Sequence, residues 1–260
     1  MQFCSVVSGS SGNCLYVREK DTRLLVDCGL SGKSAKSGLF FNGIDIADID
    51  GVLITHEHID HTKGIGVLAR QYKLDIYVTK KTYQALPSSL GVIPSDKLHF
   101  ISDTPFRIKD ISVEPFPLSH DAADPHGFQL WGEKKVCIAT DTGKITTSLI
   151  EALKGADFAF IESNHDVHML THGAYPWNLQ QRILSDFGHL PNSDAAQLAV
   201  YLAQNGTKRI MLGHLSGENN TPELAYKTTH TALCNAGFAS VAKTLEVASR
   251  SFPSDLFEIL

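Results

Sequence analysis

Short apolar runs alternate along this chain with polar and glycine-rich segments. Runs of this length, bounded by Gly, Pro, Asn or Asp, are typical of buried strands, and longer segments with helical spacing of apolar residues are typical of amphipathic helices. The pattern predicts strands at 3–7, 14–18, 24–29, 51–54, 75–79, 97–101, 111–116, 128–131, 135–139, 156–161, 209–213 and 242–247. It predicts helices at 31–41, 65–72, 81–86, 147–153, 175–187, 194–205 and 224–235. No long linker, repeat or low-complexity segment interrupts the chain, so we expect a single domain over residues 1–260.

Many of these strands end at a residue that can bind a metal ion. Judged alone, a strand-end Asp or His often caps a turn or orients a neighbour. A hydrophobic core does not need such residues at strand after strand, whereas strand ends that converge on one site do. The residues in question are Asp27, His56, His120, Asp141, Glu162 and His214.

The densest cluster is the sequence THEHIDH at 55–61, directly after the apolar run 51–54. His56 and His58 are two residues apart, so they project to the same face of an extended chain. Asp60 and His61 are adjacent and need a turn before they can point to the same place. An accidental surface cluster is the alternative, and the density of ligand residues argues against it. The motif alone is compatible with one metal ion or two.

Composition narrows the class of protein. The chain is 43% hydrophobic and 20% charged, as soluble globular proteins are, and it has no apolar run of the ~20 residues that a membrane span needs. Its five cysteines are scattered and its start does not resemble a secretory signal, so we expect reduced thiols and a cytoplasmic location. The net charge of −5 does not favour binding nucleic acid by bulk electrostatics.

A pair of divalent ions fits these residue types. Such a pair needs roughly three protein ligands for each ion and a bridging group, with the ions ~3.5–4 Å apart. Imidazole and carboxylate suit Zn, Mn or Fe and need no thiolate. His120, Asp141 and His214 would complete the ligand set begun by residues 55–61, and Asp141 is best suited to bridge because a carboxylate has two oxygens. Water held between two cations ionises near neutral pH, and the hydroxide would attack an ester, thioester, amide or phosphodiester.

The segment SGSSGN at 8–13 lies between two predicted strands and permits two interpretations. It is either a plain hairpin connection or a cradle whose backbone N–H groups and neutral side chains bind an anion. In the second case the residues that would bind substrate are Ser8, Ser10, Ser11 and Asn13.

In chain order, the strand-end Asp27, the motif THEHIDH, SHD at His120, TDTG at Asp141 and GHLS at His214 resemble the five landmark motifs of the metallo-β-lactamase superfamily. The resemblance implies an α/β fold, an αββα sandwich of two mixed sheets flanked by helices, with the metal site at one sheet edge. It also implies two sets of metal ligands, which are His56, His58, His120 and Asp141 for one ion and Asp60, His61, Asp141 and His214 for the other.

A closer likeness is to the WalJ (YycJ) branch of that superfamily. The segments that carry it are SGSSGN at 8–13, VDCGLSGK at 26–33, SHDAADP at 119–125, ESNHD at 162–166 and GHLSGENN at 213–220. Members of this branch are regarded as nucleases with 5′ to 3′ exonuclease activity on DNA. The resemblance therefore implies two divalent metal ions and a transient nucleic acid partner, DNA ends. The lack of a long apolar run predicts that there is no membrane partner.

GHLPNSD at 188–194 resembles the histidine motif that related phosphodiesterases carry before their last metal ligand. In those proteins the histidine faces the scissile phosphate and is a candidate proton donor. Pro191 stands where a serine is usual, but His189 is retained, and Asn192 is a candidate phosphate contact. We expect Asp60 and His189 to be catalytic.

The predicted function is a metal-dependent phosphodiester hydrolase, most specifically a 5′ to 3′ DNA exonuclease that uses a metal-bridging hydroxide. Asp27 and Glu162 are expected to orient ligands from behind. A small-molecule phosphodiesterase, or a thioester or lactone hydrolase, is the alternative within enzymes, because one metal frame serves all these reactions. A non-catalytic, metal-bound sensor of cell-wall signalling is the alternative outside them.

Overall fold

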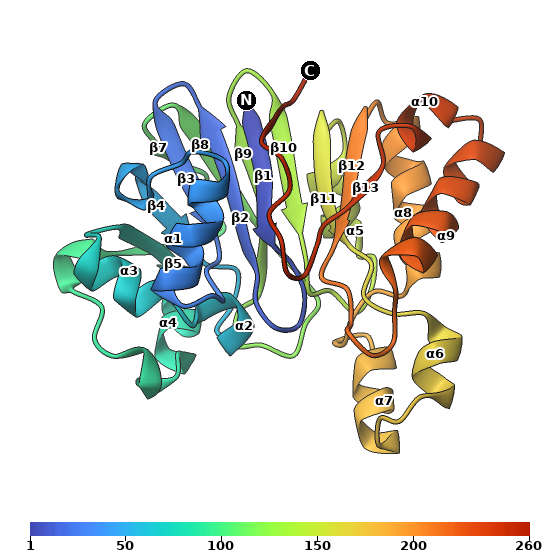
Figure 1. The fold of residues 1–260 in the computed structure, drawn as a ribbon, viewed down its shortest axis with the longest axis horizontal. Coiled ribbons are helices and arrows are strands. Elements are labelled where there is room, and N and C mark those ends of the chain that lie inside the picture. Colours follow the sequence, from blue (N-terminus) through green and yellow to red (C-terminus); the bar gives the residue numbers. More distant parts are fainter.

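The computed structural model describes residues 1–260 as two seven-stranded sheets packed face to face between two layers of helices (Figure 1). The first sheet has the strand order β14 (Phe257–Glu258), β1 (Gln2–Val7), β2 (Cys14–Glu19), β3 (Thr22–Val26), β4 (Gly51–Leu53), β5 (Asp75–Thr79) and β6 (Leu98–Ile101). The second has the order β13 (Glu246–Val247), β12 (Arg209–Gly213), β11 (Phe158–Glu162), β10 (Lys135–Ala139), β9 (His126–Trp131), β8 (Ile111–Pro117) and β7 (Phe106–Ile108). The expected αββα sandwich is confirmed.

The helices form two groups. Those beside the first sheet are α1 (Gly32–Phe41), α2 (Ile59–Thr62), α3 (Ile65–Gln71) and α4 (Lys80–Ala85), with the short 3₁₀ turns Ile46–Asp48, Ser88–Leu90 and Ser95–Lys97. Those beside the second sheet are α5 (Thr147–Leu153), α8 (Asn192–Gln204), α9 (Pro222–Asn235) and α10 (Ala239–Ala242). A further pair, α6 (Val167–His172) and α7 (Trp177–Leu184), extends from the end of the molecule opposite the two termini (Figure 1). No helix is both long enough and apolar enough to cross a membrane.

Three apolar clusters hold the four layers together. One lies between the sheets and includes Phe3, Phe158 and Phe160, whose rings are in contact. The second packs α1 and α3 onto the first sheet, and the third packs α5, α8 and α9 onto the second. The strands of the inner layers are almost fully buried, which is why they read as continuous apolar runs in the sequence.

Parallel pairing explains why polar strand ends converge. The strands β3, β4 and β5 run parallel to one another, and β10, β11, β12 and β13 do the same in the second sheet. Carboxyl ends of parallel strands lie at a common edge of their sheet. The residues that follow these strands therefore collect at one end of the sandwich, where α2 also lies.

Two expected elements are wrong. The expected strand at 242–247 is the end of α10 followed by the two-residue β13, because only Glu246 and Val247 pair with β12. Residues 167–172, expected within a polar loop, form α6 because the side chain of Asp166 accepts a hydrogen bond from the backbone N–H of Met169 at 2.9 Å and caps the helix.

Candidate metal centre

The backbone turns sharply at three of the strand ends. Asp27, Asp141 and His214 have φ values of 60°, 61° and 55°, in the left-handed region that side chains other than glycine rarely adopt. Such a conformation costs about 1–3 kcal/mol and persists where neighbouring contacts hold it. His214, for example, donates its backbone N–H to Ser8 Oγ at 2.9 Å. The turn at Asp27 also ends β3 at Val26, whereas the sequence predicted a strand that continues to residue 29.

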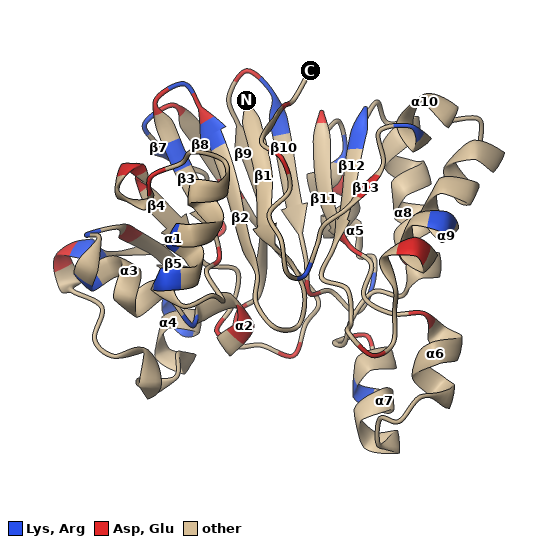
Figure 2. Cartoon of the chain, in the orientation of Figure 1, with Lys and Arg blue, Asp and Glu red and all other residues tan.

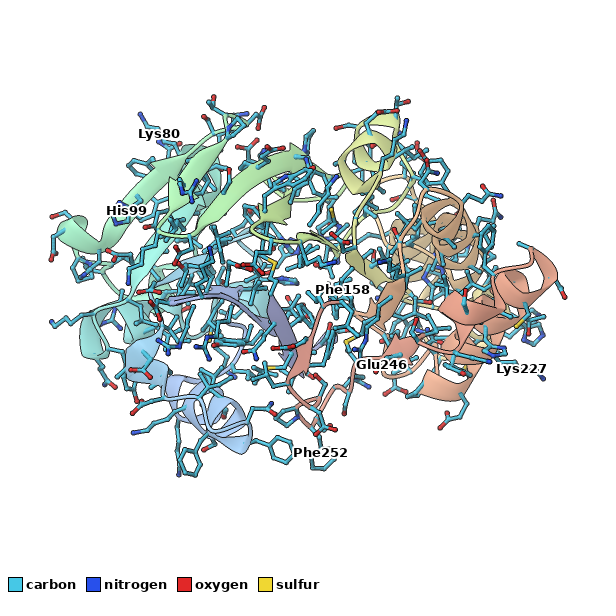
Figure 3. The ribbon with its side chains drawn as sticks, turned by 90° about the horizontal axis from the view of Figure 1, so that it is seen from above. Lys80, His99, Phe158, Lys227, Glu246 and Phe252 are labelled. Carbon is cyan, nitrogen blue, oxygen red and sulfur yellow. The ribbon has the colours of Figure 1, made fainter.

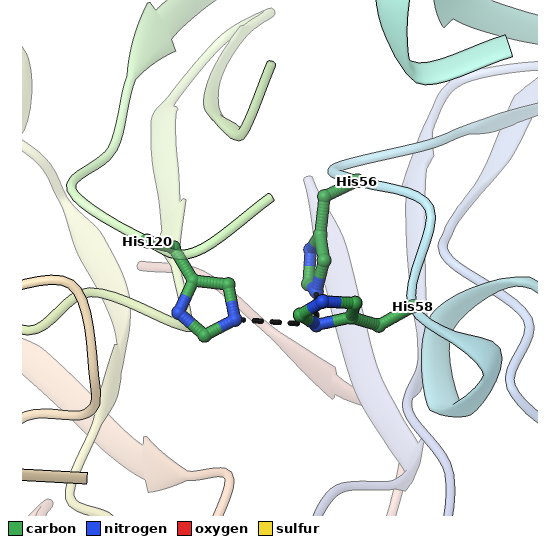
Figure 4. Close-up of side chains that lie close together, drawn as sticks. All are labelled: His56, His58 and His120. Carbon is green, nitrogen blue, oxygen red and sulfur yellow. Dashed lines mark hydrogen bonds between the residues drawn. The ribbon is translucent and has the colours of Figure 1, made fainter. Parts of the chain in front are cut away.

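Three imidazoles form the first group of candidate ligands (Figure 4). His56 and His58 lie in the extended segment between β4 and α2, and His120 follows β8. The nitrogen His58 Nδ1 lies 3.1 Å from His56 Nε2 and 3.3 Å from His120 Nε2. The sequence spacing thus places the two motif histidines together, and the second sheet supplies the third.

A second group contains Asp60 and His61, from the first turn of α2, together with His214. One oxygen, Asp60 Oδ2, lies 3.5 Å from both His61 Nε2 and His214 Nε2. Asp141 joins the two groups, because its Oδ2 is 3.1 Å from His61 Nε2 and its Oδ1 is 3.8 Å from His120 Nε2. All seven predicted ligands therefore lie in one cluster, and their assignment to metal ions stays a prediction.

Four of the histidines are fixed in orientation by an acceptor behind Nδ1. A ring nitrogen that donates its proton in this way leaves the other nitrogen as a lone pair. The distances to the acceptors are 3.0 Å from His56 to Thr55 Oγ1, 2.7 Å from His61 to Asp27 Oδ2, 3.0 Å from His120 to the Gly188 carbonyl oxygen and 2.8 Å from His214 to Glu162 Oε1. In each ring Nε2 is consequently the nitrogen that faces the other candidate ligands of the cluster.

Two buried atoms of the cluster have no hydrogen-bond partner, Asp141 Oδ2 and His214 Nε2. Leaving buried polar groups unpaired is costly, so such atoms point to a ligand. The donors are nitrogen and carboxylate oxygen without a cysteine, a set that suits Zn, Mn or Fe. The residues present therefore fit divalent cations, and these His and Asp clusters are capable of binding metal ions.

Charge in the cluster is set by burial and by close neighbours. Burial and the adjacent His61 keep the pKa of His56 well below its usual value, so the ring is neutral, as a ligand must be. Burial opposes ionisation of Asp141, but His214 and His61 hold its pKa well below the usual range. Burial also opposes the charged form of His214, yet Asp141, Asp60 and Glu162 raise its pKa to about 10. This ring must therefore exchange a proton for any cation that it binds.

Glu162 is fully buried and accepts four hydrogen bonds. Its Oε1 accepts from Nδ1 of His189 and of His214, both at 2.8 Å, and its Oε2 accepts from the backbone N–H groups of Thr142 and Leu190 at 2.9 and 3.2 Å. Burial alone would raise the pKa of Glu162, but the two histidines lower it to about 2. One carboxylate thus orients the last candidate ligand and the candidate proton donor together.

His189 faces a pocket of about 170 Å³ beside the cluster. Its side chain is 19% exposed, and because Nδ1 donates to Glu162, Nε2 is the nitrogen left to contact a molecule in the pocket. The other walls include Ser10 and Arg182, and the guanidinium of Arg182 pairs with Asp121 at 2.5 Å. Sequence reasoning missed this ion pair, because nothing in the spacing of residues 121 and 182 connects them.

Three of the residues expected to bind substrate are buried instead. Ser8 and Asn13 bond to each other at 3.0 Å, Ser8 supports His214, and Asn13 Nδ2 lies 3.1 Å from His61 Nε2. Asn192 is enclosed by hydrogen bonds to Ser163, at 2.7 Å, and to Asn220. The expectation for these three residues is corrected, because their polar atoms are already paired inside the protein.

The 8–13 loop is neither a plain hairpin connection nor a cradle formed by all of its polar residues. Ser10 and Ser11 are exposed and Ser10 lines the His189 pocket, whereas the buried ends of the loop support metal-cluster histidines. Thr55 is a further residue that sequence reasoning missed. It accepts from His56 and donates to Asp27 at 2.7 Å, and its position directly before the motif was the available signal.

Comparisons with known proteins agree with this geometry. Residues 22–215 match the model of the beta-lactamase superfamily domain. The chain is 42% identical over 249 residues to exodeoxyribonuclease YycJ of Bacillus anthracis, covering 95% of this chain and 94% of that protein. It is 44% identical over 239 residues to exodeoxyribonuclease WalJ of Streptococcus pneumoniae, covering 90% and 89%.

Solved structures show the same fold. The metallo-beta-lactamase fold protein YhfI from Bacillus subtilis superposes with a TM-score of 0.71 at 19% identity, over 98% of this chain and all of that one. A diphosphatase of the PhnP family has a TM-score of 0.68 at 16% identity, over 100% and 98%. At such identities the likeness is one of fold alone.

Proposed function

This chain belongs to the beta-lactamase superfamily, and we propose that it is a metal-dependent nuclease that shortens DNA from its 5′ end. Two relatives that it matches over about nine-tenths of their length carry the name exodeoxyribonuclease. We place the activity in a single domain, 1–260, because the cluster between the sheets takes side chains from both ends of the chain, Phe3 and Ile259.

The orientation of His189 is the observation that carries the proposal. Glu162 fixes its Nδ1–H, so Nε2 faces the pocket next to the cluster, where a leaving oxygen needs a proton. A carboxylate behind a catalytic imidazole sets both its tautomer and its direction. Ester hydrolases whose leaving group is stable without a proton have less need of such a residue, whereas a phosphodiester releases an alkoxide.

The seven clustered residues, Asp60 among them, would hold two divalent cations, Zn or Mn, and Asp141 is the residue whose oxygens lie near both groups of ligands. When bound, the cations would lower the pKa of water towards neutrality and balance the charge of the phosphate. The chain itself keeps the ring nitrogens aimed at the cluster. Asp27 does so for His61, and Glu162 does so for His214.

A small phosphodiester is the second candidate substrate. The pocket beside His189 holds about 170 Å³, below the roughly 300–1,000 Å³ of sites that enclose a drug-sized molecule. A pocket of this size accommodates one phosphate group with part of a sugar, which a small diester and the end of a DNA strand both present.

A His189→Ala variant tests the proposal. We expect turnover of DNA to fall about 10²- to 10⁴-fold, the usual contribution of general acid catalysis, while the metal content measured by atomic emission is unchanged. His230→Ala on α9 is the control for removing a histidine away from the site. Unchanged turnover in His189→Ala would show that His189 is not the proton donor. A parent protein that hydrolyses no ester would favour the alternative of a non-catalytic, metal-bound sensor.

A further inference from the structure

An open groove of about 640 Å³ runs between α1 and the C-terminal segment 250–253. It is lined on one side by Lys33 and Ser37 of α1 and on the other by Arg250 and Ser251. No acidic residue lines it, and neither Lys33 nor Arg250 takes part in an ion pair. Figure 2 shows basic residues on α1 and at the bend of the C-terminal segment. In a chain of net charge −5, this groove is locally positive.

Exposed aromatic rings border the same groove. Phe41, at the end of α1, lines it and is 63% exposed, and Phe252, in the facing segment, is 73% exposed. Figure 3 shows Phe252 at the surface beside α1. Phe40, the residue before Phe41 in α1, is 74% exposed. Because these rings are exposed, they are available to contact a bound molecule.

The groove connects to the metal cluster through hydrogen bonds. Ser249, next to Arg250, accepts from the backbone N–H of Ser8 at 2.9 Å, and Ser8 in turn accepts from His214. The Arg250 side chain lies across Gly9 so closely that a Cβ there would be 2.7 Å from its Cγ. Its guanidinium reaches Gly217, the neighbour of Ser216 in the His189 pocket.

We infer that this groove binds the single-stranded part of a DNA substrate as it leaves the metal cluster, an inference that rests on the proposed function. Lysine and arginine would contact phosphates, the serines would add neutral donors, and the phenylalanines would stack on bases. A positive groove bordered by aromatic rings is the usual design for single strands, whose bases expose their faces. A duplex hides those faces, so Phe41 and Phe252 would not contribute to binding one.

Two double variants test the inference in the full-length, metal-loaded protein. Lys33→Gln with Arg250→Gln removes the two charges, and Phe41→Ala with Phe252→Ala removes the rings. The matched control is Lys227→Gln with Lys243→Gln, which removes two exposed lysines that do not line the groove. Figure 3 shows Lys227 away from Phe252. Thermal melting checks that each variant is folded.

Binding is measured by fluorescence anisotropy with a cleavage-resistant phosphorothioate single strand, at several salt concentrations. We expect the charge variant to bind more weakly and to reduce the slope of log affinity against log salt by about 1.4, at about 0.7 for each phosphate that the protein no longer neutralises. We expect the aromatic variant to bind at least about fivefold more weakly, the lower limit for one stacked base. The control should match the parent.

A small diester separates this inference from the proposed function. Bis(p-nitrophenyl) phosphate is too short to cross the groove, so the aromatic variant, which leaves Arg250 in place, should hydrolyse it at the parental rate while kcat/KM for single-stranded DNA falls. Groove variants that bind and cleave the strand as the parent and the control do would overturn the inference. A parent protein that hydrolyses the small diester but leaves all DNA intact would instead refute the assignment of DNA as the substrate. The groove inference would then fail as well, because it rests on that assignment.

Discussion

Replacing Asp27 by Asn removes one negative charge and almost nothing else. The left-handed backbone at this position, φ 60°, is one that asparagine also tolerates, so the turn after β3 should survive. Asp27 Oδ1 accepts from the Thr55 N–H at 2.9 Å, and the amide oxygen can keep that bond. Oδ2 accepts at 2.7 Å from both Thr55 Oγ1 and His61 Nδ1, and there the amide presents hydrogens to two donors.

The magnitude follows from the removal of these two hydrogen bonds. At about 1.5 kcal/mol for each bond to a charged group, the free energy of unfolding of the metal-free protein should fall by about 3 kcal/mol. For a chain of this size that corresponds to a decrease in Tm of about 6–12 °C. His61 is also left without the acceptor that keeps its proton on Nδ1, so affinity for zinc should fall about 10- to 100-fold.

Competition with a chromophoric chelator measures the zinc affinity, and calorimetry with EDTA measures Tm. Asp75→Asn is the matched control, because Asp75 also accepts from a histidine, His99 at 2.9 Å, but does so at the surface of the first sheet. If Asp27→Asn binds zinc as tightly as Asp75→Asn does, the reasoning about ring orientation is refuted.

Three further predictions concern metal binding, thiols and the buried polar network. Adding zinc at about 100 times its Kd should stabilise the protein by about 2.7 kcal/mol in a thermal melt. The zinc affinity should increase with pH up to about pH 10, because His214, whose pKa is about 10, must lose a proton to bind the ion. With a thiol reagent near pH 8, Cys234 should react quickly, whereas Cys137, buried and with a pKa raised to about 12, should react only after unfolding; equal rates would contradict its burial. Asn192→Ala should lower the free energy of unfolding by about 1–3 kcal/mol in urea, since it leaves Asn220 and Ser163 without their partners, and an unchanged midpoint would contradict the network.

The parts that the sequence predicted well are those with a strong local pattern. The buried strands are continuous apolar runs, and THEHIDH places four candidate ligands in the six consecutive residues 56–61, shortly after the end of β4. The order of the remaining motifs predicted the fold family, and parallel pairing then brings His56 and Asp141 to the same end of the sandwich. No long-range information was needed for these steps.

The parts that failed depend on contacts between distant residues. Ser8 and Asn13 belong to a loop of small polar residues, a composition that reads the same whether its side chains face a substrate or support a histidine 48 positions away. Asn192 is equally ambiguous, because its partner Asn220 lies on another segment. The α6 helix was missed because six residues carry too little periodicity to predict it.

Cleavage of end-labelled DNA tests the central proposal most directly. Single- and double-stranded DNA and RNA, labelled at one defined end, would be incubated with the protein and Mn²⁺ or Zn²⁺, and with EDTA as the control. We predict that DNA labelled at its 3′ end shortens progressively, that EDTA abolishes the reaction, and that His189→Ala slows it. DNA that stays intact with every metal, while cyclic nucleotides or thioesters are hydrolysed, would contradict the nuclease assignment.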